Sequence, residues 1–171
     1  MNRRSALSFV VGSTVAFAMA YLIAGGLSYQ LLTKQFYVGP EPIFATYLRS
    51  EANPAEWSHT STWLVPALLA RAVLISVVLL PFREALRQMS AVRRALAVFG
   101  LVFMLQHLAA GAPSPSNIEG LLYMKPALIS PRAFLLTQPE MLVQALLFAA
   151  GVTWLLAPRA ERKARSAGYP A

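Results

Sequence analysis

Apolar residues fall into four long runs along the chain, separated by polar and charged segments. The runs extend over residues 5–33, 60–82, 95–112 and 141–158. A helix needs about 20 apolar residues to cross a bilayer, with about 17 as a working minimum, so each run is long enough. The pattern predicts an all-α integral membrane protein, a single four-transmembrane-helix bundle over residues 1–171. The predicted spans cover residues 6–32, 57–82, 95–112 and 139–157, and a basic cytoplasmic tail covers 158–171.

The segments before the second and fourth runs carry helix-start signals. Asn53-Pro54-Ala55-Glu56 offers an N-cap, a proline at the first helical position and a glutamate at the third. Thr137-Gln138-Pro139-Glu140 repeats much of this pattern. The second helix is therefore predicted to begin near Pro54 and the fourth near Gln138.

The loops after the first and third runs are long, and each is predicted to contain a short interfacial helix. In the first loop, residues 43–49 read as such a helix. In the other outer loop, Ser116 and Glu119 make a capping box, so the simplest role of Glu119 is to start a short helix. Residues 118–129 are rich in apolar side chains, and exposed apolar segments mark a covered surface. This loop lies on the bilayer surface, re-enters between helices or is capped by a partner.

Lysine and arginine are unevenly divided between the two sides of the predicted membrane. Outside the spans, ten lie in the N-terminus, the second loop and the tail, against four in the other two loops. The positive-inside rule then predicts that both termini are cytoplasmic. We expect the membrane to be the inner membrane of a bacterium. The formal charge of +8 does not indicate nucleic-acid binding, because the basic residues lie at span ends, where topology and anionic lipid headgroups explain them.

The N-terminal run has one alternative interpretation. Arg3-Arg4, an apolar run and Ala18-Met19-Ala20 together resemble a cleaved signal peptide. The run continues to Leu32, well beyond a signal-peptide core, and this favours an uncleaved anchor.

Arg71 lies at the centre of the second run, which carries no other charge. An arginine there costs roughly 2.5–3.5 kcal/mol on insertion scales, so a polar partner, a water-filled cavity or a ligand must surround it. Two interpretations stay open: Arg71 is a buried structural residue, or it binds a ligand that a kink at Pro66 admits. The candidate intramembrane polar or ligand-binding residues are Arg71, Gln106, His107, Glu119 and Glu140.

The first run carries small residues at every fourth position. Such a stripe lets another helix approach closely, here a helix of the same chain or, less favoured, a partner protein. The helix-packing candidates are Ser8, Gly12, Ala16, Ala20, Ala24 and Ser28.

Candidates for catalysis and metal binding are few. The chain has no Cys and no Asp, and we expect no cofactor. Glu56 and His59 form one Glu-x-x-His, with His107 in the next helix, but carboxylate-bridged di-metal bundles use two such motifs and two further glutamates. We therefore predict no metal site.

These observations favour a non-catalytic accessory, scaffold or helix-packing subunit whose partners are the lipid bilayer and a homo-oligomer or larger membrane complex. The alternative is a small permease or binding protein for an anionic or amphipathic molecule, with Arg71 as its counter-ion. A membrane-embedded lipid-modifying enzyme using Glu119, His107 and Arg71 comes third. An Arg71 beside an open cavity favours the last two functions, and an Arg71 sealed by side chains favours the first.

Overall fold

The structure, a computed structural model, describes residues 3–40, 42–107, 114 and 117–157, apart from the side chains of residues 106, 107 and 121. Within these ranges every regular element is a helix. The long helices are α1 (Arg3–Ser28), α3 (Pro54–Leu79), α5 (Ala91–His107) and α7 (Pro131–Leu156). The short ones are the π-helical turn η1 (Tyr29–Thr33), α2 (Gln35–Val38), the 3₁₀ turn η2 (Ile43–Thr46), α4 (Arg83–Gln88) and α6 (Ile118–Tyr123).

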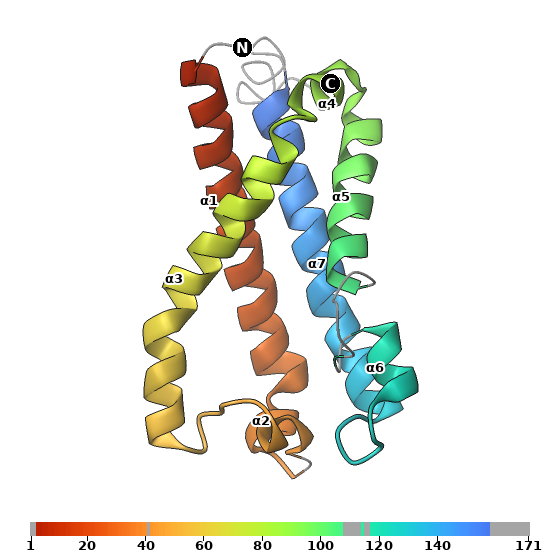
Figure 1. Cartoon of the computed structure of the whole chain (residues 1–171). Coiled ribbons are helices and arrows are strands. Elements are labelled where there is room, and N and C mark those ends of the chain that lie inside the picture. Colours follow the sequence, from red (N-terminus) through yellow and green to blue (C-terminus); the bar gives the residue numbers. More distant parts are fainter. Residues whose placement is uncertain (1–2, 41, 108–113, 115–116, 158–171) are drawn as a thin grey trace.

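The helices α1 and α7 pack together along the centre of the molecule, while α3 packs on α1 and α5 packs on α7 (Figure 1). The start of α1, the end of α7 and the short helix α4 lie at one end of the molecule, which we call the α4 end. The helices α2 and α6 lie at the opposite end, which we call the loop end. Because α3 runs obliquely, it is close to α1 toward the α4 end and distant from it at the loop end (Figure 1).

Three helices are long and apolar enough to span a membrane: Arg3–Thr33 (α1 with η1), Pro54–Leu79 and Pro131–Leu156. Large apolar side chains such as Leu7, Leu74 and Leu146 are more than half exposed, as expected of helices that face lipid. These features indicate a membrane protein. The helix α5 packs beside α7, but the predicted fourth span, residues 95–112, lies partly outside the described residues and stays a prediction.

The helix α7 begins earlier than the sequence predicted. It starts at Pro131 and not near Gln138, because Ser130 is its N-cap and accepts a hydrogen bond from the Ala133 amide at 3.1 Å. Pro131 then occupies the first helical position, where its missing N–H costs nothing. Pro139 lies inside the helix, and the side chains of Thr137 and Gln138 donate to the Phe134 carbonyl. The predicted start signal, Thr137-Gln138-Pro139-Glu140, therefore lies within the helix and does not start it.

The N-cap of α6 also differs from the predicted one. Asn117 Oδ1 accepts a hydrogen bond from the Gly120 amide at 2.7 Å, so Asn117 caps this helix, while the predicted cap, Ser116, lies outside the described residues. A Cβ on Gly120 would overlap the Ser114 carbonyl, and glycine is therefore required there. The interfacial location of α2, η2 and α6 stays a prediction.

The main core lies between α1, α3, α5 and α7 toward the α4 end. Phe17 and Phe148 meet edge to face there, with ring centroids 5.2 Å apart, and both are fully buried. The backbones of α1 and α7 approach closely, since a Cβ on Gly151 would lie 2.8 Å from the Cβ of Ala16. Small residues thus let these two helices pack tightly, as is usual in membranes.

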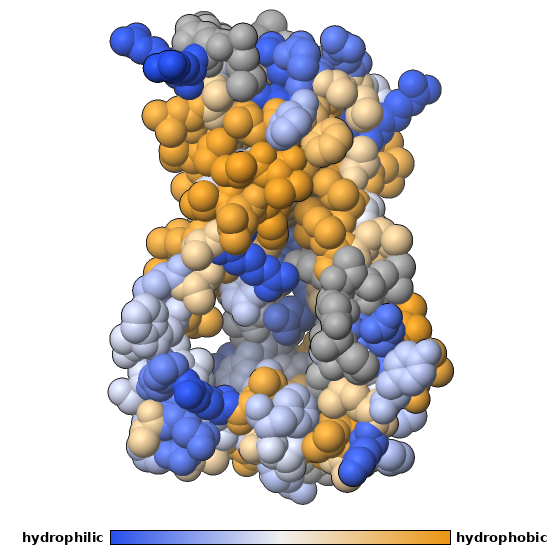
Figure 2. All heavy atoms as spheres, viewed as in Figure 1, coloured by the Kyte–Doolittle hydropathy of each residue, from blue (hydrophilic) through white to orange (hydrophobic). Residues whose placement is uncertain are grey.

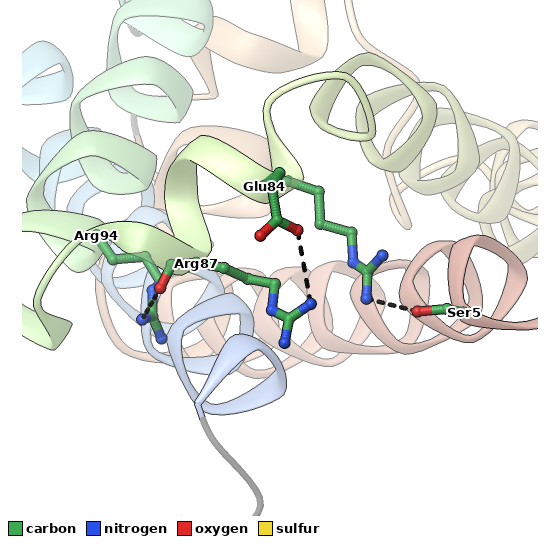
Figure 3. Close-up of polar contacts among 5 residues, drawn as sticks. Ser5, Glu84, Arg87 and Arg94 are labelled. Carbon is green, nitrogen blue, oxygen red and sulfur yellow. Dashed lines mark hydrogen bonds and ion pairs between the residues drawn. The ribbon is translucent and has the colours of Figure 1, made fainter. Parts of the chain in front are cut away.

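Arg94 links three helices at the α4 end. Its side chain is buried, with 3% exposure, and its guanidinium donates to four backbone carbonyls. The acceptors belong to Leu86, Arg87, Met89 and Thr153, so one side chain joins α4 and α5 to the end of α7. Figure 3 shows the bond to Arg87. Arg83 makes a second link, because it donates to the Ser5 hydroxyl at 2.7 Å and lies over the Phe9 ring. This end of the molecule is therefore closed by polar links as well as by apolar packing.

Candidate functional site

The first half of α3 stands away from the rest of the bundle. Of residues 54–67 only Thr60 is even partly shielded, whereas Leu68, Ala72, Ser76 and Leu79 in the second half are buried. Three hydroxyl side chains in the first half donate to carbonyls of their own helix. Their polar groups are thus satisfied without another helix, which is how Ser and Thr are accommodated in membrane helices. The first half of α3 leaves a space beside α1.

This space is a cavity of about 640 Å³, a volume typical of small-molecule sites. Figure 2 shows the corresponding hollow in the loop-end half of the molecule, bordered by hydrophilic and weakly polar side chains, below a continuous apolar belt. Its walls come from α1, η1, the first half of α3 and α7, and its floor comes from α2 and the residues after η2. The lining residues are Tyr21, Leu22, Gly25, Gly26, Tyr29, Thr33, Tyr37, Tyr47, Leu48, Arg49, Ser50, Trp57, Thr60, Leu64 and Glu140.

Aromatic rings and glycines dominate the cavity wall. Four tyrosines and Trp57 line it, so most of its surface is apolar with hydroxyl groups at intervals. The glycine pair of α1 provides the room, since a Cβ on Gly26 would meet nothing within 4 Å. Gly25 and Gly26 thus border the cavity, and Gly26 faces open space.

Glu140 is the acidic group of the cavity. It comes from α7, is half-buried, and its carboxylate faces α1, where a Cβ on Gly25 would lie 3.4 Å from Oε1. Among the described residues no basic side chain lies within ion-pair distance of it. A half-buried carboxylate in a spanning helix is costly without a partner, so this position calls for a cation or a proton.

Arg71 does not line the cavity itself, but it lies on α3 two helical turns beyond the lining residue Leu64. Its side chain is exposed, and its guanidinium carbon lies 5.8 Å from the centre of the Phe17 ring, within cation–π range. Helical spacing places Arg71 on the same face of α3 as Thr60 and Leu64, which line the cavity. Arg71 and Glu140 both interact electrostatically with the hydroxyl of Tyr21. Arg71 is thus not sealed by side chains, and it lies close to an open cavity.

An ion pair holds the cavity floor to the end of α1. Lys34 Nζ lies 2.8 Å from the Glu51 carboxylate. The hydrogen bond from Lys34, with a further one from Tyr29, holds the pKa of Glu51 below its ordinary value, and the same bond raises the pKa of Lys34. Burial raises the pKa of Tyr37 to about 12, so this phenol stays neutral at physiological pH.

The remaining predicted residues do not assemble with Arg71. Glu119 is on α6, which lies on the opposite side of the α1–α7 pair from α3 (Figure 1). Glu56 and His59 are exposed on the first turns of α3, and no group of three potential metal ligands occurs among the described residues. Gln106 and His107 end α5, but their side chains lie outside the described residues.

The small-residue stripe of α1 lies mostly against its own chain. Ala20, Ala24 and Ser28 are buried, and Gly12 and Ala16 are half-buried against Leu155 and Gly151 of α7. Ser8, the first residue of the stripe, is exposed.

No protein-family model matches the chain, and neither the curated proteins nor the solved structures contain a match to it. The cavity must therefore be interpreted from its own residues.

Sequence reasoning missed two features, the tyrosine-lined cavity and the structural role of Arg94. Tyr21, Tyr29 and Tyr37 recur eight residues apart, which is close to two helical turns and gives a weak signal of a shared face. Arg94 precedes Val98 and Val102 by four and eight residues, so it continues a buried stripe of α5. That register could have identified it as the buried arginine.

Proposed function

We propose that this protein binds an amphipathic molecule in the cavity between α1 and α3, as a small membrane binding protein or permease. The observation that carries the proposal is a cavity of about 640 Å³ that is walled by spanning helices and lined by aromatic rings. Such a cavity can take an apolar chain from the bilayer and still offer hydroxyl and charged groups to a polar headgroup. The exposed Arg71 beside it favours binding over a purely structural arginine.

An accessory or scaffold role is the second candidate, and it draws on α6. Leu122 and Tyr123 there are 68% and 73% exposed, which suits a partner or the bilayer surface. The stripe on α1 no longer supports this role specifically, because most of it packs within the chain.

A single glycine substitution tests the proposal. Gly26→Leu should fill the cavity without a clash, since a Cβ there meets nothing within 4 Å. The control is Gly100→Leu on α5, which also has open space around its Cβ and does not line the cavity. Both changes replace glycine in a helix and should leave folding intact.

Native mass spectrometry of the three proteins, extracted gently from membranes, gives the readout. We expect a bound amphiphile on the parent and on Gly100→Leu, and its loss from Gly26→Leu. Equal occupancy in all three proteins, or a co-purifying protein with no small molecule, would favour the scaffold role instead.

A further inference from the structure

We propose that the ligand of this cavity is a zwitterionic amphiphile, with its ammonium group at Glu140 and its acidic group at Arg71. This inference rests on the proposed binding function and adds the chemical class of the headgroup. It starts from two opposite charges on different helices that have no ion-pair partner among the described residues.

Glu140 supplies the ammonium site. Its carboxylate faces a space bordered by Tyr21, Tyr29 and Tyr37, whose rings can contact a cation while the carboxylate neutralises it. Lys34 is already paired with Glu51 at 2.8 Å and is not a free cation for Glu140. A ligand ammonium group would therefore be the cation that pairs with Glu140.

Arg71 supplies the acid site. Side chains on a helix tilt toward its N-terminus, and the N-terminal half of α3 is the half that lines the cavity. The long side chain of Arg71 can therefore reach toward the headgroup of a bound molecule. A guanidinium is planar and carries a fork of donors that matches a carboxylate or phosphate.

The two charged groups do not neutralise each other. They lie on α3 and α7, with Tyr21 of α1 interacting with both, and they are farther apart than the 4.0 Å of an ion pair. A headgroup that carries both charges can occupy the space between Glu140 and Arg71 and pair with both side chains. A purely cationic ligand would leave Arg71 unpaired, and a purely anionic ligand would leave Glu140 unpaired.

A set of amphiphiles with the same alkyl chain tests this headgroup assignment. The probes are dodecyl betaine (zwitterionic), dodecyltrimethylammonium (cationic) and dodecanoate (anionic), each titrated against the full-length protein in nanodiscs. We expect the zwitterion to bind the parent about tenfold or more tightly than either singly charged probe. Relative to the cation it gains a charge-assisted hydrogen bond from Arg71, and relative to the anion it gains charge and cation–π contacts of its quaternary ammonium, which has no N–H to donate.

Two variants separate the two ends of the headgroup. Glu140→Gln should weaken the zwitterion and the cation by about tenfold and leave the anion unchanged. Arg71→Gln should weaken the zwitterion and the anion by a similar factor and leave the cation unchanged. Arg93→Gln is the matched control, because Arg93 is an exposed arginine of α5 that does not line the cavity, and it should change none of the three affinities by more than about twofold.

The result distinguishes the headgroup inference from the binding function. If all three probes bind equally in every variant but not in Gly26→Leu, the cavity binds amphiphiles and the zwitterion assignment is wrong. Arg49 is the arginine of the cavity floor, so loss of acid binding in Arg49→Gln and not in Arg71→Gln would also overturn the assignment. If no probe binds the parent, or Gly26→Leu binds all of them as the parent does, the binding function itself fails.

Discussion

Arg94 and Arg71 are both arginines on apolar helices, and their surroundings differ completely. Arg94 is 3% exposed and donates to four backbone carbonyls, so its charge is fully engaged by the protein. Arg71 is exposed, and its contact among the described residues is the face of the Phe17 ring. An arginine that closes a helix junction is structural, whereas an arginine beside an open cavity is available to a ligand.

The same difference separates the two ends of the molecule. At the α4 end, α1 and α7 approach so closely that a Cβ on Gly151 would lie 2.8 Å from that of Ala16. At the loop end, Gly26 of α1 borders open space and the first half of α3 is exposed. Glycine thus permits close packing at one end and provides cavity volume at the other. The molecule combines a closed half that holds the helices together with an open half that can bind.

Removal of Arg94 should have the largest effect on stability. In Arg94→Met, four backbone carbonyls lose the hydrogen bond from the guanidinium, three of them in the segment from Leu86 to Met89. The Leu86 carbonyl keeps the bond from the Met89 amide. Buried acceptors left unsatisfied cost about 1–3 kcal/mol each, so we expect a loss of about 3 kcal/mol or more. Thermal unfolding in detergent measures it. The control is Arg93→Met, an exposed neighbour that should change stability by less than about 0.5 kcal/mol.

A destabilisation by Arg93→Met as large as that by Arg94→Met would contradict this account. It would mean that the positive charge at the start of α5, and not the carbonyl contacts of one buried guanidinium, stabilises the α4 end.

The same small mutation at two glycines should have opposite effects. Gly151→Ala places a methyl group against Ala16, which cannot move without the α1 backbone, and overpacking of this kind costs about 1–3 kcal/mol. Gly26→Ala adds its methyl group to open space, and alanine in a helix is favoured over glycine by up to about 1 kcal/mol. The two melting temperatures should therefore move in opposite directions. A fall of similar size in both variants would show that the loop end is packed as tightly as the α4 end.

The sequence predicted the helical class and three of the spans because length and apolarity determine whether a helix can cross a membrane. It also predicted the start of α3, where Asn53 accepts hydrogen bonds from the amides of Ala55 and Glu56. It misplaced the start of α7, because Ser130-Pro131 and Gln138-Pro139 are both possible helix starts and the local sequence does not decide between them. The cavity depends on the oblique course of α3 relative to α1. The pattern of apolar residues along the sequence does not specify the angle between two helices.

The smallest expected effect concerns the ion pair at the cavity floor. Because the pKa of Glu51 is lowered in the folded protein, its stabilising contribution is present above the ordinary glutamate pKa of about 4.3 and is lost as the pH falls further. Glu51→Gln should therefore melt at a temperature lower than the parent by at most about 2 °C at pH 7, and the difference should vanish near pH 3. Glu84→Gln is the control at the α4 end, where the ion pair with Arg87 is longer, at 3.5 Å, and more exposed. A difference that persists at pH 3 would mean that Glu51 acts through packing and not through its charge, so that the floor of the cavity, like the α4 end, would be held by contacts that do not depend on pH.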